Sequence, residues 1–91
     1  MMSTELFTIP LFFGLNEVDL PVGSELVAIH ISQNDVEAQF KGLATEPLQQ
    51  RRFYVALGDE KIPSDIGVFR HLKSIQLQDK GYTAEVFEVY Q

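Results

Sequence analysis

Hydrophobic and polar residues alternate one by one along much of this chain, and that alternation limits the fold more than any other feature. Residues 36–41 read VEAQFK, with a hydrophobic side chain at every second position. Successive side chains of a β-strand point to opposite faces, so a period of two is typical of a half-buried strand. Residues 26–32 (LVAIHIS) and 52–57 (RFYVAL) are short runs rich in β-branched or aromatic residues, as buried strands are. No long stretch carries a helical stripe, and we predict an all-β fold.

A two-residue turn at Gln33 and Asn34 predicts the register of one hairpin, because Asn tolerates the left-handed conformation that such turns need. With that turn His30 faces Glu37 on one side of the hairpin. The hydrophobic pairs on the other side are Ile31 with Val36, Ile29 with Ala38, and Val27 with Phe40. A slip of one residue would send half of these side chains to the wrong face, so the pattern specifies the register.

A second hairpin is predicted around Lys80 and Gly81. As a two-residue turn, they give three favourable cross-strand pairs: Leu77 with Ala84, Ile75 with Val86, and Lys73 with Glu88. A three-residue turn with a glycine bulge is the competing interpretation. It would place Ile75 opposite Glu85, so we favour the tighter turn.

The other segments complete one small domain over residues 1–91. Residues 5–10 are predicted to form a first strand that ends at Pro10, and residues 16–20 a short strand. Thr45 could cap a single helical turn that runs through Gln50, and residues 58–67 (GDEKIPSDIG) are predicted to form a polar loop. We expect six or seven antiparallel strands in meander order, curled into a small barrel or a two-layer sandwich, with at most that one helical turn.

The charged residues are unevenly placed within a net charge of −6. Residues 1–40 contain six acids and no Lys or Arg, whereas all seven basic residues fall between Lys41 and Lys80. Affinity for nucleic acids comes mainly from Lys and Arg, so general nucleic-acid binding is not expected. A basic protein surface, or a small anion held by a local basic group, is a more natural partner. No hydrophobic run approaches the length of a membrane span, and no membrane association is expected.

The order of these segments resembles a family of small, uncharacterised proteins found in tailed-phage and prophage genomes. The matching features are residues 9–11 (IPL), 20–31 (LPVGSELVAIHI), 51–55 (RRFYV), 62–63 (IP) and 86–90 (VFEVY). Members tend to carry histidines where this chain has Asp59 and Glu88, and a third-strand tryptophan that is absent here, with Phe40 nearby. The resemblance implies a phage accessory protein in the host cytoplasm and supplies no activity to carry over. The absence of cysteine fits a reducing compartment.

Two basic groups are the strongest candidates for a ligand or partner site. Alternation places Arg51 on one face of a strand and Arg52 on the other, beside Tyr54. An arginine next to a tyrosine can hold a phosphate and stack on a base. Arg70 and His71 form a second basic group that is expected to lie near the first. A small anionic nucleotide bound at a subunit interface of a homo-oligomer is one ligand that these five residues would suit.

Leu11, Phe12 and Phe13 form a consecutive hydrophobic run in a loop-like position, and they are a candidate interface. No nucleophile motif, metal-ligand spacing or phosphate-binding loop is present, and we predict no enzymatic activity, no metal and no cofactor. Together with the phage setting that the resemblance implies, these features predict a non-enzymatic protein that occupies or sequesters a host factor, either a host or anti-phage defence protein or a nucleotide signal. A structural or assembly component of the phage particle is the alternative.

Overall fold

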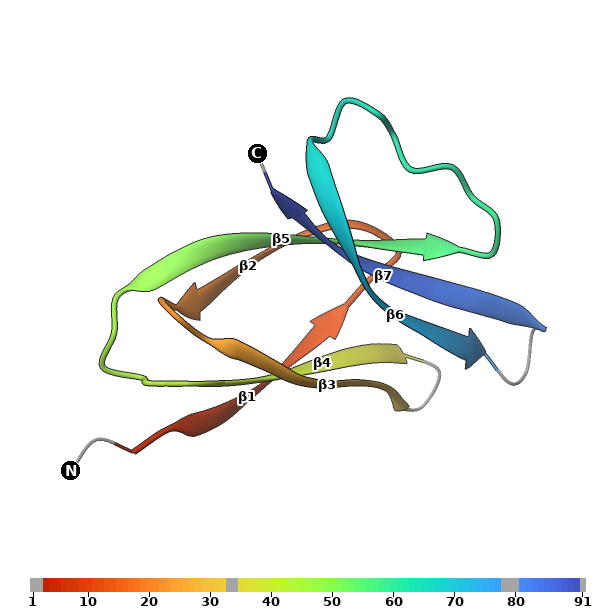
Figure 1. Ribbon diagram of the computed structural model, residues 1–91. Coiled ribbons are helices and arrows are strands. Elements are labelled where there is room, and N and C mark those ends of the chain that lie inside the picture. Colours follow the sequence, from red (N-terminus) through yellow and green to blue (C-terminus); the bar gives the residue numbers. More distant parts are fainter. Residues whose placement is uncertain (1–2, 33–34, 78–80, 91) are drawn as a thin grey trace.

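The computed structural model describes residues 3–32, 35–77 and 81–90, and these residues form an all-β fold (Figure 1). No helix occurs among them, so the predicted fold class is confirmed. The strands are β1 (Glu5–Leu11), β2 (Gly14–Pro21), β3 (Glu25–Ser32), β4 (Asp35–Gly42), β5 (Leu48–Leu57), β6 (Val68–Leu77) and β7 (Tyr82–Tyr90).

The strands form two antiparallel sheets rather than one continuous meander. The smaller sheet has the order β1-β4-β3, and the larger has the order β2-β5-β7-β6. Within the described part of the chain, consecutive strands pair only in the β3–β4 and β6–β7 hairpins. The chain crosses between the sheets after β1, β2 and β4, and β7 lies between β5 and β6 in the larger sheet. The meander order was therefore wrong. Crossing between sheets lets both hydrophobic faces meet, whereas a single open sheet would leave one of them in water.

The inner faces of the two sheets pack together as a two-layer sandwich. The rings of Phe40 in β4 and Phe53 in β5 meet across the layers, with their centroids 5.4 Å apart. The other buried hydrophobic residues of this core are Leu11, Leu20, Ile29, Val36, Ala38, Val55, Leu77, Ala84 and Val86. These residues come from both sheets and follow the alternation of the sequence.

The β3–β4 hairpin confirms most of the predicted register. Ile31 pairs with Val36, and the pairs Ile29–Ala38 and His30–Glu37 also form as expected. The predicted pair of Val27 with Phe40 is wrong: the register shifts between Leu26 and Ala28, so Leu26 lies opposite Phe40. Val27 is left exposed by this bulge. The predicted turn at residues 33–34 lies outside the described residues.

The β6–β7 hairpin has the predicted faces but not the predicted register. Leu77 pairs with Tyr82 and Ile75 with Ala84, which is a shift of two residues from the prediction. A shift of two keeps each side chain on its own face, so the alternation could not distinguish the two registers. Of the segment that joins the strands, the structure describes Gly81, which has a φ of 67°. Residues 78–80 lie outside the described part of the chain.

Two local predictions are corrected. Pro10 does not end the first strand but lies within β1, opposite Glu37. A proline is tolerated there because β1 is an edge strand whose outer side makes no ladder bonds. Residues 48–50 form the start of β5 and pair with the end of β2, so the helical turn is wrong. The loop at residues 58–67 is confirmed; its side chains Ile62 and Ile66 pack on the outer face of the four-stranded sheet.

Candidate functional site

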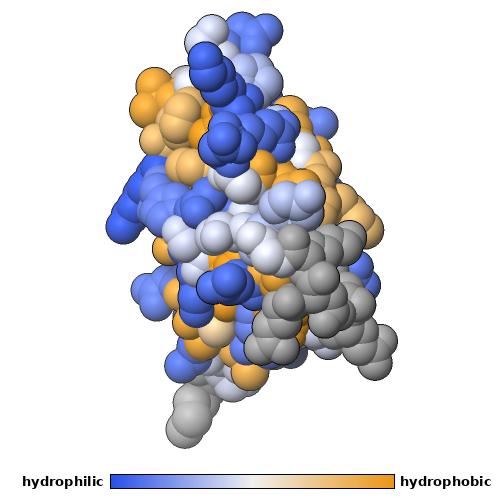
Figure 2. Space-filling view, turned by 90° about the vertical axis from the view of Figure 1, so that its right-hand side faces the viewer, coloured by the Kyte–Doolittle hydropathy of each residue, from blue (hydrophilic) through white to orange (hydrophobic). Residues whose placement is uncertain are grey.

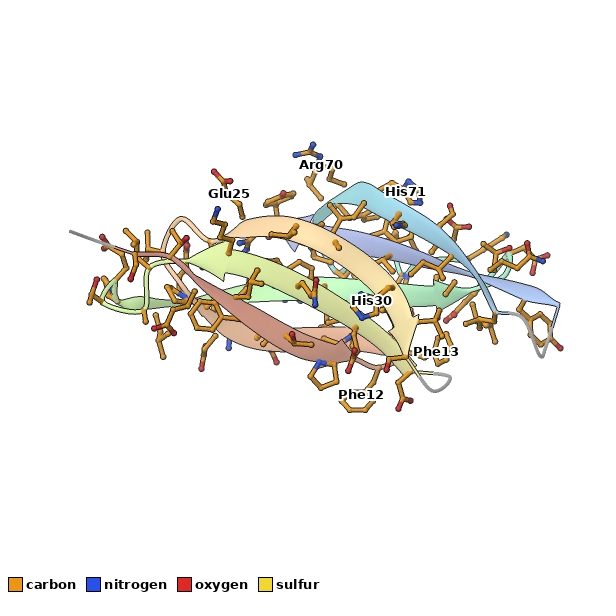
Figure 3. All side chains as sticks on the ribbon, turned by 90° about the horizontal axis from the view of Figure 1, so that it is seen from below. Phe12, Phe13, Glu25, His30, Arg70 and His71 are labelled. Atoms are coloured by element: carbon orange, nitrogen blue, oxygen red, sulfur yellow. The ribbon has the colours of Figure 1, made fainter. Side chains whose placement is uncertain are left out.

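The five residues predicted to hold a ligand do not form one cluster. Arg51 lies on the inner face of the four-stranded sheet, where Phe53 and Val55 also lie. Arg52 and Tyr54 contact the 58–67 loop on the outer face. Arg70 and His71 lie on β6, an edge strand of the same sheet (Figure 3).

Arg51 is engaged inside the protein. Its Nε and Nη2 atoms donate to the two carboxylate oxygens of Glu88 at 2.8 and 2.9 Å. Its Nη1 atom donates to the backbone carbonyl of Ser24 at 2.7 Å. The guanidinium carbon also lies 5.3 Å from the Phe40 ring centroid and 5.6 Å from that of Phe53. The hydrogen bonds to Glu88 raise the pKa of Arg51 above its ordinary value. Arg51 thus covers two aromatic rings of the core.

A cavity of about 580 Å³ lies beside this ion pair. It is lined by Gly23 and Ser24, residues 49–52 at the start of β5 and residues 88–90 at the end of β7. Amide, guanidinium and phenol groups in this lining can bond a small polar molecule. An anionic ligand would have to compete with Glu88 for Arg51, so the cavity is poorly suited to a nucleotide phosphate.

Arg52 and Tyr54 support the 58–67 loop. Arg52 Nη1 donates to the carbonyl of Ile66 at 3.5 Å, a long bond, and the Tyr54 hydroxyl donates to Glu60 Oε2 at 3.2 Å. Glu60 Oε1 in turn accepts from the backbone N–H of Leu57 at 3.1 Å. Burial, followed by the nearby Glu60 carboxylate, raises the pKa of Tyr54. Arg52 and Tyr54 therefore hold the 58–67 loop against the sheet, a role that the alternation of the sequence does not predict.

His71, Ser74 and Glu85 meet on the outer face of β6 and β7 but lack the geometry of a catalytic triad. In a triad one ring nitrogen faces the nucleophile and the other faces the carboxylate. Here His71 Nε2 contacts both Glu85 Oε1, at 2.8 Å, and Ser74 Oγ, at 3.3 Å. The Ser74 hydroxyl itself donates to Glu85. The hydroxyl donates to the carboxylate rather than to the imidazole, so His71 is not placed to take the proton of Ser74 as a triad histidine does.

The other histidine also forms a surface pair. His30 Nε2 lies 3.2 Å from Glu37 Oε1, with both side chains partly exposed. Among residues 3–32, 35–77 and 81–90, no group of three or more His, Asp or Glu side chains could hold a metal ion. The same residues contain no helix of the length and hydrophobicity needed to span a bilayer.

Hydrophobic side chains are also exposed at the surface, and on the face shown in Figure 2 they lie in patches separated by hydrophilic residues. Phe12 and Phe13, which are 67% and 53% exposed, are two adjacent aromatic residues at the crossing from β1 to β2. We call these two residues the aromatic corner. Leu11, the third residue of the predicted interface, is buried in the core instead.

The buried side chain of Asn16 fixes the backbone of the aromatic corner. Its Oδ1 atom accepts from the N–H of Phe12 at 2.9 Å, and its Nδ2 atom donates to the carbonyl of Phe12 at 2.8 Å. Nδ2 also lies within bonding distance of the carbonyls of Gly14 and Phe53. Gly14 has a φ of 95°, which a side chain would disfavour. Asn16 was not predicted as a functional residue, although an Asn two residues after the glycine that follows Phe12 and Phe13 is a recognisable signal for a side-chain-to-backbone bond.

Acidic residues lie beside the aromatic corner. Pro10 and Leu11 pair with Glu37 and Val36, so Asp35 comes next along β4 at the level of the corner. Asp35 is exposed. Figure 3 shows Phe12 and Phe13 on the side of the molecule where β3 ends. The corner is therefore a rigid hydrophobic projection with a negatively charged margin.

Comparison of the chain with protein-family models, curated proteins and solved structures gives no match. The fold assignment therefore depends on the strand pairing and the core described above. The resemblance to a phage family, and the function that it implies, stay predictions.

Proposed function

We propose that this protein is a non-enzymatic phage accessory protein that binds a host protein and occupies a surface that the host protein needs. The aromatic corner is the contact that inserts into the partner. The single observation that supports this function is the pair of exposed aromatic side chains, Phe12 and Phe13, on a backbone held by the buried Asn16.

Rigid aromatic side chains are efficient binding groups. Burying an exposed phenylalanine side chain is worth about 1.5–3 kcal/mol, and binding energy is usually concentrated in a few such residues. Ordering a loop at an interface opposes binding, and Asn16 removes that cost before the partner arrives. Two adjacent aromatic residues in water gain nothing for the isolated fold, so a binding role accounts for their position.

The charges around the corner indicate the chemistry of the partner. Glu37 and Asp35 on β4 flank it, and Glu17 lies on the adjacent strand β2. A hydrophobic pocket with a basic rim would complement such a surface and would speed the encounter. A defence protein of the host that binds nucleic acid is one class of protein that carries such basic surfaces.

The nucleotide variant of this function has less support. It needs Arg51, Arg52 and Tyr54 to be free for a phosphate and a base, and each of them contacts another part of the protein. A thermal-shift panel of nucleotides tests it, because a bound ligand stabilises the folded state.

A pull-down from infected host cells tests the role of the aromatic corner. The test variant is Phe12→Ser/Phe13→Ser, and the matched control is Leu6→Ser/Leu48→Ser, which replaces side chains that are 63% and 67% exposed elsewhere on the surface. We expect the purified host partner to bind the corner variant at least about 100-fold more weakly, and the control as it binds the wild type. Retention of the partner by a folded corner variant would refute this proposal.

A component of the phage particle is the second candidate function. It is favoured by the charges on the two edge strands of the larger sheet, which suit the stacking of copies: β2 carries the exposed acids Glu17 and Asp19, and β6 carries the exposed bases Arg70 and Lys73. Detection of the protein in purified virions would support it, and its absence from them would exclude it.

A further inference from the structure

Strands β2 and β6 are the two edges of the four-stranded sheet. Figure 3 shows them on opposite sides of the sandwich, with β6 in light blue and β2 in salmon. An edge strand presents unpaired backbone N–H and C=O groups, which can pair with a strand of another chain. Each molecule thus offers two such edges in its larger sheet.

The two edges carry opposite charges. Strand β2 has two exposed acids, Glu17 and Asp19, and no basic residue. Strand β6 has exposed Arg70, His71 and Lys73, and no acid. None of Glu17, Asp19, Arg70 and Lys73 takes part in an ion pair within the described residues. Glu25 of β3 lies on the same side of the molecule as Arg70, so one acid accompanies the basic residues there (Figure 3).

Strand direction is compatible with pairing between these edges. Every neighbouring pair in the sheet is antiparallel, so β2 and β6 of one molecule run in opposite directions. A second copy placed beside the first in the same orientation therefore brings its β6 antiparallel to the first copy's β2. The sheet continues across the contact with the geometry that it already has.

Each edge strand has a regular stretch that is able to pair with a strand of another molecule. Strand β2 pairs with β5 without a register shift from Gly14 to Pro21, so its free side is regular. Strand β6 has one bulge, between His71 and Lys73, and is regular from Lys73 to Leu77. Exposed hydrophobic residues lie at both edges and could be covered by a neighbour: Leu15 on β2 and Val68 and Phe69 on β6.

We propose that these two edge strands bind further copies of the same chain, with β2 of one molecule paired to β6 of the next. Contacts of β2 with β2, or of β6 with β6, bring like charges together and are disfavoured. The contact is therefore head-to-tail rather than two-fold symmetric. Repetition of such a contact produces a ring or an open helical assembly, depending on the twist that accumulates at each step. This inference is independent of the aromatic corner.

Charge reversal at each edge tests the contact. The first variant is Glu17→Lys/Asp19→Lys, the second is Arg70→Glu/Lys73→Glu, and the third combines all four substitutions. In sedimentation velocity, the wild type should form species larger than a dimer as concentration rises, and high salt should weaken them. Each two-residue variant should associate at least about tenfold more weakly. An equimolar mixture of the two, or the four-residue variant alone, should associate again because opposite charges face each other once more.

Hydrogen exchange on the unmodified protein gives a second measurement, which does not require the variants to fold. Amides of β2 and β6 should gain protection with concentration, while those of β1 should not. A wild type that stays monomeric, or that stops at a dimer, would overturn the proposal. Association of each two-residue variant that is as strong as that of the wild type would overturn it too. The Phe12→Ser/Phe13→Ser variant should associate normally; if it does not, copies meet at the corner rather than at these edges.

Discussion

Arg51 and Glu88 form a two-point ion pair that joins β5 to β7 on the inner face of the larger sheet. Their side chains are only 21% and 10% exposed. The Tyr90 hydroxyl also donates to Glu88 Oε1, at 3.2 Å, and Arg51 reaches the carbonyl of Ser24 in the turn before β3. The pair therefore connects strands that are distant in sequence, and it covers the aromatic rings at the end of the core.

Breaking this pair should destabilise the fold. Arg51→Met leaves the Glu88 carboxylate partly buried without its partner, and Glu88→Gln removes the charge that Arg51 faces. We expect Arg51→Met to lower the free energy of unfolding by about 2–3 kcal/mol, somewhat less than for a fully buried pair. Urea denaturation followed by circular dichroism measures the change. The double variant Arg51→Met/Glu88→Gln should lose less than the sum of the two single changes. Additive losses would show that the two side chains do not depend on each other.

The role of Arg51 illustrates what the sequence could and could not predict. Alternation placed Arg51 on the face of Phe53 and Arg52 on the face of Tyr54, and the structure agrees. Alternation does not say which face meets the second sheet, or that Glu88 lies diagonally across from Arg51 on β7. Those facts depend on strand order and long-range register. The two arginines that were predicted to bind a ligand consequently have separate structural roles. Arg51 forms the ion pair with Glu88, and Arg52 contacts the 58–67 loop.

The aromatic corner should lose its order when Asn16 is replaced. Asn16→Ala leaves the backbone N–H and C=O groups of Phe12 without their side-chain partner. We expect a loss of about 2–3 kcal/mol in the free energy of unfolding, since a buried polar group without a partner costs about 1–3 kcal/mol. Hydrogen exchange of the Phe12 amide should accelerate more than that of the Phe53 amide. Equal acceleration at both amides would mean that the whole protein is loosened and that Asn16 has no specific role at the corner.

Glycine is required where the 58–67 loop returns to the sheet. Gly67 has a φ of 119°, and a Cβ at this position would lie 2.5 Å from the carbonyl oxygen of Tyr90. Gly67→Ala should therefore cost about 2–3 kcal/mol of stability. Gly58→Ala is the matched control, since Gly58 has a φ of 61° and open space around it, and the change should cost about 1 kcal/mol. Thermal and urea unfolding compare the two; similar losses would contradict the predicted clash with Tyr90.

The loop itself was easier to predict than its packing. Polar residues with Gly, Pro and Asp predicted the irregular segment at 58–67, and it is irregular. Ile62 and Ile66 were part of that polar stretch, but they pack against Tyr54 and Ala56 on the outer face. Two hydrophobic residues in a loop do not show which surface they cover, because the loop can return over either face of the sheet.

Acid should weaken the hairpin of β6 and β7 through Glu85. The Ser74 hydroxyl that donates to this carboxylate, followed by His71, lowers the pKa of Glu85 below its ordinary value of 4.5, and burial opposes them in part. A carboxyl group whose pKa is lower in the folded state stabilises that state above the unfolded pKa, and this contribution is lost as the pH falls through the folded value. Unfolding free energies measured from pH 7 to about pH 3 should therefore show a wild-type advantage over Glu85→Gln that is constant above about pH 5 and shrinks below 4.5. Ser74→Ala removes the largest cause of the shift, so it should flatten the acid dependence in the same range. A wild-type advantage that persists unchanged to pH 3 would show that the Glu85 charge does not stabilise the hairpin.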